Sequence, residues 1–325
     1  MTQLKTTFAG LSLRNPIIIS SSSLTNSAEK NKILELAGAG AIVLKSVFEE
    51  QIMMEAHHMA TYGSPEGDDY LSTYVRSHAL NEYISLIEQT KKLCTIPVIA
   101  SINCFSNSEW TDFARTVEAA EADALEINIL SLQTEKEYQY GSFEQRHIDI
   151  VSSIKKQISI PVIVKLGSNL TNPIALINQL YANGAAAVVL FNRFYQPDIN
   201  IKDLTFRATN VMSSPNELAN RIRWTAISSA EVPQIDYAIS GGVHCGKGLI
   251  KSILAGATAV EVCSAIYQYG NKTIEEMKNE LTTWMDENEY ETIGQFKGKM
   301  NAAAAGEINP FERTQFMKYY SNHEE

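Results

Sequence analysis

Residues 161–191 read PVIVKLGSNLTNPIALINQLYANGAAAVVLF, and this stretch contains one complete copy of the pattern that decides the fold. The apolar, β-branched run at 161–165 predicts a strand. Asn172 followed by Pro173 is typical of a helix start, and apolar residues at three- and four-residue spacing continue the helix to residue 183. Gly184-Ala185 then ends the helix, and residues 187–191 predict the next strand. The stretch therefore predicts strand, helix, strand.

The same kind of apolar run recurs along the chain, and each run after the first follows a helical pattern. The eight runs are 17–20, 41–45, 97–101, 124–128, 161–165, 187–191, 236–240 and 259–263. They are short and apolar throughout, which is typical of parallel strands buried on both faces. Eight strand-helix units are what a closed (β/α)₈ barrel needs, whereas an open doubly wound sheet commonly uses about five or six strands. We therefore predict an α/β fold, one TIM-barrel domain spanning residues 1–325.

Two long segments interrupt the regular alternation. Residues 48–78 follow the second strand and residues 192–233 follow the sixth. In a barrel the carboxyl ends of the strands carry the active site. These inserts are therefore predicted to be lids or walls of a site rather than separate domains.

Composition and charge narrow the class of protein. With 27 basic and 37 acidic residues the net charge is −10, which disfavours nucleic acid or an anionic membrane as a partner. The four cysteines, Cys94, Cys104, Cys245 and Cys263, lack CxxC spacing, so neither disulfides nor a zinc site is predicted. The first fifteen residues lack the apolar core of a signal peptide, and no apolar stretch is long enough to span a membrane. We expect a cytoplasmic protein with a small-molecule substrate.

Polar residues gather where the predicted strands end. Lys45 and Lys165 each end an apolar run, and burying a lysine is costly unless it is paired or faces an anion. An anionic ligand explains both lysines; alternatively, each only reaches solvent at the rim. Ser240-Gly241-Gly242 and Cys263-Ser264 follow the last two strands, where barrels commonly bind phosphate, although the glycine pair alone could form only a tight turn. Glu55, His57 and His58 lack the spacing of a metal motif, so no metal site is predicted.

Several motifs, in their order along the chain, resemble the dihydroorotate dehydrogenase family, flavin mononucleotide (FMN) barrels, and most closely its soluble class 1. Residues 6–10, TTFAG, followed by Asn15-Pro16, resemble the opening hairpin and first strand of that family. GATAVEVCSAI at 256–266 resembles its last strand, and YETIGQFKGK at 290–299 resembles its closing helix and loop. The resemblance covers nearly the whole chain.

The resemblance implies FMN as cofactor and a role for each polar strand end. Lys45 would lie near substrate and flavin, and Lys165 near N1 and O2 of the flavin ring, where a cation stabilises the charge of the reduced ring. Asn128 and Asn192 would hold a pyrimidine. The other flavin contacts implied are Asn103 at the ring, Ser20, Ser21 and Ser22 along the ring and ribityl chain, and Ser240, Gly241, Gly242, Cys263 and Ser264 around the phosphate. A homodimer is also implied.

The catalytic base departs from the family pattern. The family removes a proton from C5 of dihydroorotate while hydride passes from C6 to flavin N5, and soluble class 1 members use a cysteine as base. Here Ser131 stands where that cysteine would be. A hydroxyl is a weak base that needs a proton acceptor behind it, so Ser131 is either the base or a polar loop residue in a changed site.

The substrate loop departs as well. The family's Asn-x-Met-Gly-x-x-Asn motif is missing, and residues 63–70 read GSPEGDDY, whose acidic side chains would repel a substrate carboxylate. Arg76 or Arg193 could compensate. Dihydroorotate oxidation is the first hypothesis. The alternatives are an FMN enzyme acting on another reduced pyrimidine or enoate, a non-catalytic flavin-binding barrel, and a phosphate-binding lyase or isomerase without flavin. The electron acceptor stays open among fumarate, NAD and quinone.

Overall fold

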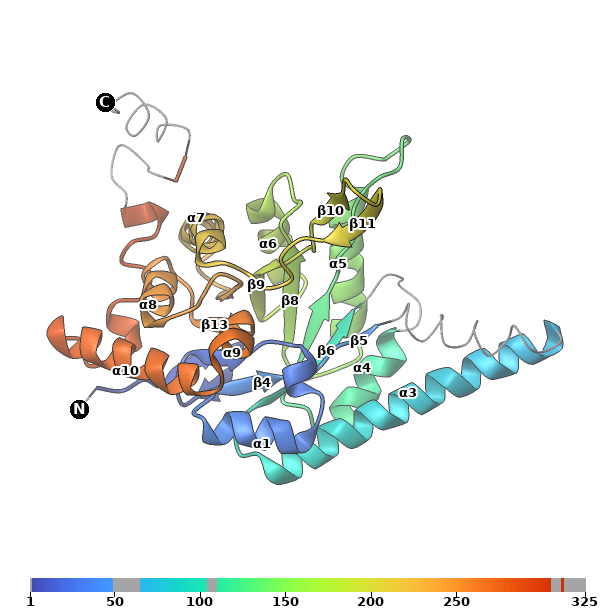
Figure 1. Ribbon diagram of the computed structural model, residues 1–325, viewed down its shortest axis with the longest axis horizontal. Helices are drawn as coiled ribbons and strands as arrows, with labels where there is room; N and C mark the ends of the chain where they lie inside the picture. The colour runs from blue at the N-terminus through green and yellow to red at the C-terminus, as the bar shows by residue number, and fades with distance from the viewer. Residues whose placement is uncertain (1, 49–64, 104–109, 305–310, 313–325) are drawn as a thin grey trace.

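The computed structural model describes residues 2–48, 65–103, 110–304 and 311–312; for residues 65–77 and 110–112 it describes the backbone only. Within these ranges, parallel strands form a barrel in which neighbouring strands follow the chain order, and the pairing of β4 with β6 closes the ring (Figure 1). The eight barrel strands are β3 (Ile17–Ile19), β4 (Ala41–Val43), β6 (Val98–Asn103), β7 (Ala124–Asn128), β8 (Val162–Gly167), β9 (Ala187–Asn192), β12 (Asp236–Ser240) and β13 (Ala259–Val262). A short strand, β5 (Val47–Phe48), extends the pairing along β6. The predicted TIM barrel is confirmed.

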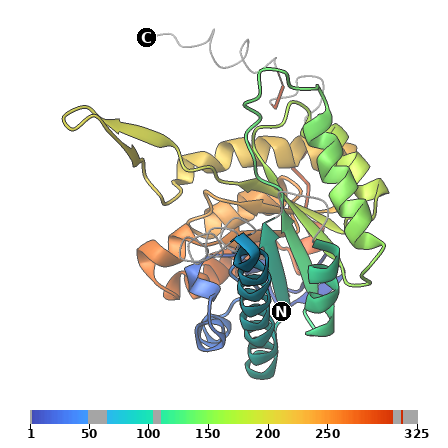
Figure 2. The same ribbon diagram turned by 90° about the vertical axis from the view of Figure 1, so that its right-hand side faces the viewer.

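Helices cover the outside of the barrel (Figures 1 and 2). They are α1 (Ala28–Leu36), α3 (Pro65–Leu93), α4 (Trp110–Ala119), α5 (Ser142–Lys155), α6 (Pro173–Ala182), α7 (Leu218–Glu231), α8 (Gly246–Leu254), α9 (Ser264–Tyr269) and α10 (Lys272–Glu287), with 3₁₀ turns η1 (Ser23–Thr25), η2 (Pro215–Glu217), η3 (Ile293–Gln295) and η4 (Ala302–Ala304). The predicted start of α6 is confirmed, because Asn172 Oδ1 accepts a hydrogen bond from the backbone N of Ala175 at 3.1 Å. Among the described residues, no helix is both long and apolar enough to cross a membrane.

The amino end of the barrel is closed by a hairpin of β1 (Thr6–Phe8) and β2 (Leu11–Leu13). Phe8 and Leu13 are fully buried and pack with inward-facing strand residues such as Ile18 and Val43. This plug fills one end of the barrel with apolar side chains. The other end, at the carboxyl ends of the strands, is the end where a ligand can enter.

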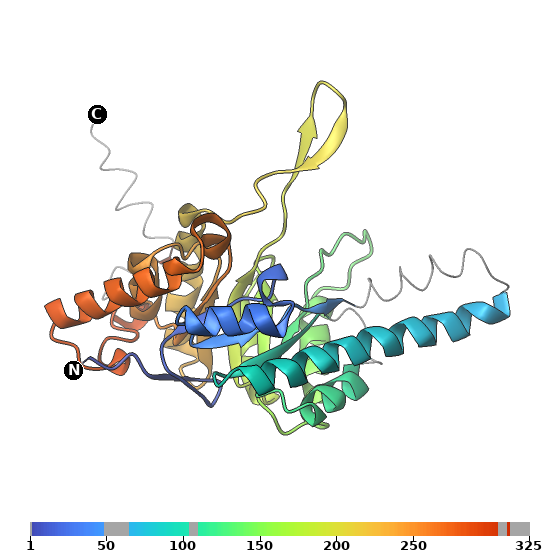
Figure 3. The same cartoon turned by 60° about the horizontal axis from the view of Figure 1, so that its bottom comes forward.

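The bounds predicted for both inserts include residues that belong to barrel helices. The segment predicted as insert 48–78 is helical from Pro65 onward, because proline suits a first helical position and no proline interrupts the sequence up to Leu93. Residues 49–64 lie outside the described residues. The segment predicted as insert 192–233 includes α7, a regular barrel helix, so the true insertion is shorter. It contains a hairpin of β10 (Pro197–Asn200) and β11 (Thr205–Ala208), which projects away from the barrel (Figures 2 and 3).

Candidate functional site

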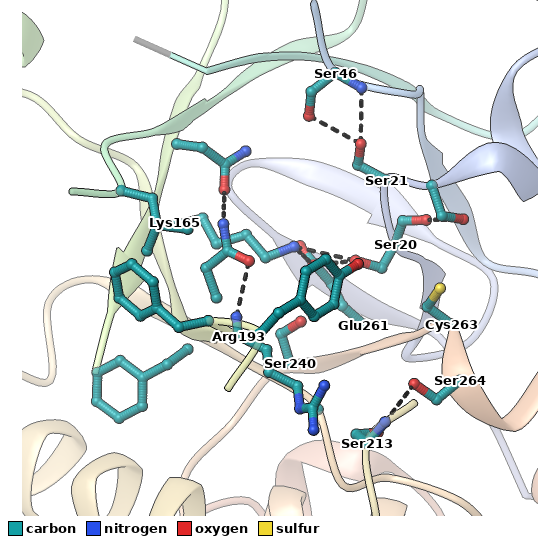
Figure 4. Close-up of a pocket in the computed structure, with 18 of the residues that line it drawn as sticks. Ser20, Ser21, Ser46, Lys165, Arg193, Ser213, Ser240, Glu261, Cys263 and Ser264 are labelled. Atoms are coloured by element: carbon teal, nitrogen blue, oxygen red, sulfur yellow. Dashed lines mark hydrogen bonds and ion pairs between the residues drawn. The ribbon is translucent and has the colours of Figure 1, made fainter. Parts of the chain in front are cut away.

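A cavity of about 630 Å³ lies at the carboxyl ends of the barrel strands, a size within the range of about 300–1,000 Å³ common for small-molecule sites (Figure 4). The structure brings nearly all predicted site residues together around it. Those lining it are Ser20, Ser21, Ser22, Lys45, Asn103, Asn128, Lys165, Asn192, Arg193, Ser240, Gly241, Gly242, Cys263 and Ser264. Their individual roles stay predictions.

The floor of this cavity carries a buried ion pair. Lys165, the fourth residue of β8, is 5% exposed, and its Nζ lies 2.5 Å from Oε2 of Glu261 on β13. Ser20 Oγ completes the arrangement, accepting from Lys165 Nζ and donating to Glu261 Oε2, each at 3.0 Å. Glu261 also lines the cavity. Sequence reasoning missed it, although a single charged residue inside the apolar run 259–263 was a signal.

A second carboxyl lies behind the first. Glu126 on β7 is fully buried, and its Oε1 is 3.6 Å from Lys165 Nζ. The same oxygen accepts from Asn128 Nδ2 at 3.4 Å and from Ser101 Oγ at 3.5 Å. Glu126 Oε2 is buried and receives no N–H or O–H from the part of the chain that the structure describes. The floor thus contains one ammonium and two carboxyl groups.

These three groups shift one another's pKa values. Burial raises the pKa of Glu126 well above its usual range, and the neighbouring Glu261 raises it further, although Lys165 opposes both. Burial alone would also raise the pKa of Glu261, but Lys165 outweighs it and holds that pKa below the usual value. Burial would lower the pKa of Lys165, yet the two carboxyls reverse this and raise it. Lys165 is therefore a cation at neutral pH, and Glu126 retains its proton more readily than Glu261.

The side-chain amides of Asn128 and Asn192 lie beside the floor and are hydrogen-bonded to each other. Asn192 Nδ2 donates to Asn128 Oδ1 at 3.0 Å, and the backbone N of Arg193 donates to Asn192 Oδ1 at 2.8 Å. Each amide orientation is therefore fixed by a protein partner. Such a pair offers oriented donors and acceptors to a flat heterocycle with carbonyl and N–H groups on its edge.

Serine hydroxyls line the opposite wall. Ser21 Oγ lies 2.9 Å from Ser46 Oγ, and Ser46 Oγ lies 2.8 Å from Ser101 Oγ. Ser21 and Ser46 line the cavity, whereas Ser101 is fully buried and donates onward to Glu126. A row of hydrogen bonds therefore connects this wall to the buried carboxyl.

The end of the cavity predicted to hold phosphate is built by small residues. Gly242 has φ +83°, and a Cβ there would lie 2.5 Å from the backbone N of Leu218, so only glycine fits. Ser213 joins the two predicted segments: its Oγ accepts from Gly242 N at 3.3 Å and its backbone N donates to Ser264 Oγ at 3.0 Å. Arg221 on α7 supports the loop from behind, donating from Nε to the Ser240 carbonyl at 3.0 Å. Sequence reasoning missed Ser213 and Arg221, because only the fold brings them to these strands.

The rim of the cavity differs from the floor. β4 ends at Val43, so Lys45 lies beyond the strand and is exposed; the expectation that it ends a buried strand was wrong. Lys45 has no ion-pair partner among the residues described. Arg193 lines the cavity, but its guanidinium donates to Glu217 Oε2 at 3.1 Å and to the carbonyls of Asn210 and Val211 at 2.8 and 2.9 Å. The Arg193 guanidinium is therefore already paired with protein groups.

Ser131 follows β7 and is partly exposed, and it is not among the residues that line the cavity. Its Oγ accepts a hydrogen bond from Gln133 Nε2 at 3.0 Å. An amide N–H donates a proton and cannot accept one. Within the described ranges, no group accepts the Ser131 proton, so its assignment as a base stays a prediction.

Other sequence candidates lie outside the described residues. Glu55, His57, His58 and Cys104 are among them, as are Gly63 and Ser64 of the substrate loop. From Pro65 to Ser77, which includes Arg76, only the helical backbone is described. In the ranges that the structure does describe, no group of three or more His, Cys, Asp or Glu side chains could hold a metal ion.

The sequence of this chain was compared with protein families and with individual known proteins. A family model described as Dihydroorotate dehydrogenase matches residues 3–285. The chain belongs to the dihydroorotate dehydrogenase family. It is 30% identical over 308 residues to a protein of Thermoplasma volcanium, covering 92% of this chain and 98% of the relative, and that protein is named dihydroorotate dehydrogenase B (NAD(+)), catalytic subunit. Proteins with the same name from Thermoplasma acidophilum and Methanocaldococcus jannaschii are 27% and 24% identical, covering 92% and 87% of this chain and 99% and 94% of the relatives.

In this member of the dihydroorotate dehydrogenase family, the residues at the strand ends lie within the matched range. It extends from the β1–β2 plug into α10 and so includes every strand of the barrel and every residue that lines the cavity. The relatives are similar along nearly their whole length, so the family assignment does not depend on one shared motif.

Proposed function

We propose that this chain is an FMN-dependent oxidoreductase that oxidises dihydroorotate to orotate, a step of pyrimidine biosynthesis. The observation that carries the proposal is the cavity itself, in which a buried cation, a pair of oriented amides and a glycine-rich end lie together in a barrel of this family. A buried cation, an amide pair and a small-residue turn are the groups needed by a reducible ring, a pyrimidine and a phosphate respectively.

The residues present fit FMN. The glycine-rich end, with Gly242, Ser213 and Ser264, is lined by small side chains, which leave room for a phosphate. Ser20 and Lys165 on the floor, with Ser21 and Ser46 on the wall, offer hydrogen-bonding groups along a flat ring. When bound, FMN would accept the hydride that the substrate gives up.

The chain's own residues would orient the substrate and handle its proton. Asn128 and Asn192 would hold the pyrimidine edge, with their amides already aligned by hydrogen bonds. Lys45, exposed and without a protein partner in the described ranges, would attract the substrate carboxylate. Oxidation removes a hydride from C6 and a proton from C5, and the electrons of the broken C5–H bond form the new double bond. Ser131 is the candidate to take that proton.

A second candidate function is oxidation of another reduced pyrimidine, or of a saturated acid to an enoate. The observation favouring it is at Ser131, whose hydroxyl accepts from Gln133 and finds no proton acceptor among the described residues. A base without support works slowly. A substrate with a more acidic C–H would need less help from this position.

The proposal also covers the domain organisation, the cellular location and the oligomeric state. The whole chain would form one FMN-binding domain, and it would act in the cytoplasm. It would form a homodimer, which is supported by the apolar surface of the projecting hairpin, where Ile199, Ile201, Leu204 and Phe206 are all exposed. The hairpin also carries both Asp198 and Arg207, so two copies of it are compatible in charge.

Two observations on purified protein test the proposed function. A yellow flavin absorbance, present as isolated or restored by added FMN, supports cofactor binding; a colourless protein that takes up no FMN would refute it. Anaerobic addition of dihydroorotate to the yellow protein should then bleach the flavin. Bleaching by another dihydropyrimidine or by an enoate precursor, and not by dihydroorotate, would favour the second candidate.

A further inference from the structure

The floor of the cavity has more acidic groups than its single cation can balance. Lys165 faces Glu261 at 2.5 Å and Glu126 at 3.6 Å, and the two carboxyls are fully or almost fully buried. If both carboxyls were ionised, the cluster would have a net charge of −1 although its side chains are almost entirely buried. An unbalanced buried charge is costly, and two adjacent carboxyls usually share one proton instead.

The contacts identify which carboxyl is protonated. Glu261 Oε2 receives the Lys165 ammonium and the Ser20 hydroxyl, two donors that stabilise an ionised carboxylate. Glu126 Oε2 receives no donor from the described residues, and a proton on the Glu126 carboxyl lets it donate to the neighbouring Glu261. The other titratable neighbours do not supply charge: burial raises the pKa of Cys263 and of Tyr83, so both stay neutral at neutral pH.

We propose that Glu126 holds a proton, that Glu261 is ionised, and that Glu261 lowers the reduction potential of a flavin bound in this cavity by cancelling the charge of Lys165. The proposal rests on the proposed binding of FMN. Glu261 lines the cavity and Glu126 does not, so Glu261 is the carboxylate whose field reaches a bound ligand. Lys165 beside an ionised Glu261 presents a neutral pair, which stabilises an anionic reduced ring less than a free cation does.

The two glutamates provide a matched pair of variants. Glu261→Gln removes a negative charge next to Lys165, and we expect the equilibrium constant for flavin reduction to rise at least about tenfold, or about 30 mV for a two-electron couple. Glu126→Gln replaces a neutral carboxyl by a neutral amide of the same shape, so the potential should stay at the wild-type value. An equal rise in both variants would show that Glu126 is ionised and overturn the proposal. An unchanged potential in Glu261→Gln would overturn it as well.

A second measurement needs neither substrate nor turnover. Infrared spectra of the wild-type protein at neutral pH should contain the carbonyl band of a buried protonated carboxyl, and Glu126→Gln should lack this band while Glu261→Gln keeps it. Absence of the band from the wild-type protein would overturn the proposal even if a variant fails to fold or to bind flavin. A colourless protein that shows the band would refute the proposed cofactor but leave the protonation of Glu126 intact.

Discussion

The floor and the rim of the cavity each carry a lysine, and the two side chains differ in burial and in ion-pair partners. Lys165 lies inside β8, is 5% exposed and is held by Glu261, Glu126 and Ser20. Lys45 lies two residues beyond the end of β4, is exposed and has no ion-pair partner in the part of the chain that the structure describes. The floor charge is part of the folded structure, whereas the rim charge is free to meet a ligand.

Because of this difference, substitutions at the floor and at the rim should have different effects. Changes at the floor remove a partner from a buried network and should affect folding first. Changes at Lys45 on the rim, and at the partly exposed Ser131 that follows β7, should affect substrate binding or reaction while the protein stays folded.

The largest expected effect is at Lys165. Lys165→Met leaves Glu261 buried beside no cation, so we expect a loss of about 3–5 kcal/mol in the free energy of unfolding, measured by urea denaturation. The double variant Lys165→Met/Glu261→Gln removes both charges and should recover most of that loss. If Lys165→Met alone were as stable as the wild type, the floor would not be a charge-paired network.

The second effect is a pH dependence that belongs to Glu126. Its pKa is raised in the folded protein, so above the ordinary glutamate value of 4.5 the folded state binds more protons than the unfolded state. The wild-type free energy of unfolding should therefore fall as pH rises from 4.5 toward the folded pKa, by up to about 1.4 kcal/mol per pH unit for one proton. Glu126→Gln should lack this component.

Denaturation of wild type and Glu126→Gln across that pH range measures it. The variant should gain stability relative to wild type as pH rises. Glu261 acts with the opposite sign: its pKa is lowered on folding, so its stabilisation is present above 4.5 and is lost as pH falls below that value. Parallel wild-type and Glu126→Gln curves would mean that Glu126 ionises normally.

The contrast between floor and rim also shows what sequence alone can and cannot provide. Apolar runs were sufficient to predict the eight strands, and strand ends together with the family resemblance predicted many of the residues that line the cavity, because barrel geometry brings all strand ends to one mouth. The pairing of Lys165 with Glu261 required the register of strands far apart in the chain, because β12 and β9 lie between β13 and β8 around the barrel. Exposure at Lys45 depended on where β4 ends, a boundary that an apolar run does not define to within two residues.

The third effect concerns Ser131, which follows β7. If Ser131 is the base, Ser131→Ala should slow anaerobic flavin bleaching by at least about tenfold, a barrier increase of about 1.4 kcal/mol, with the free energy of unfolding unchanged. Thr134→Ala, which removes an exposed hydroxyl from the same loop, is the matched control and should bleach at the wild-type rate. A wild-type rate in Ser131→Ala would remove the assignment and direct attention to residues outside the described ranges.

The smallest expected effect on folding is at Lys45, and it completes the comparison with Lys165. Lys45→Met removes an exposed charge without a described partner, so the free energy of unfolding should stay within about 0.5 kcal/mol of wild type. Its effect should instead appear in the reaction, as a higher KM for an anionic substrate with a smaller change in kcat, and the KM effect should weaken as salt screens the charge. Lys92→Met, an exposed lysine on α3, controls for the general loss of a surface charge and should change neither quantity. If Lys45→Met lost as much stability as Lys165→Met, both lysines would be structural, and the division between a fixed floor and an available rim would fail.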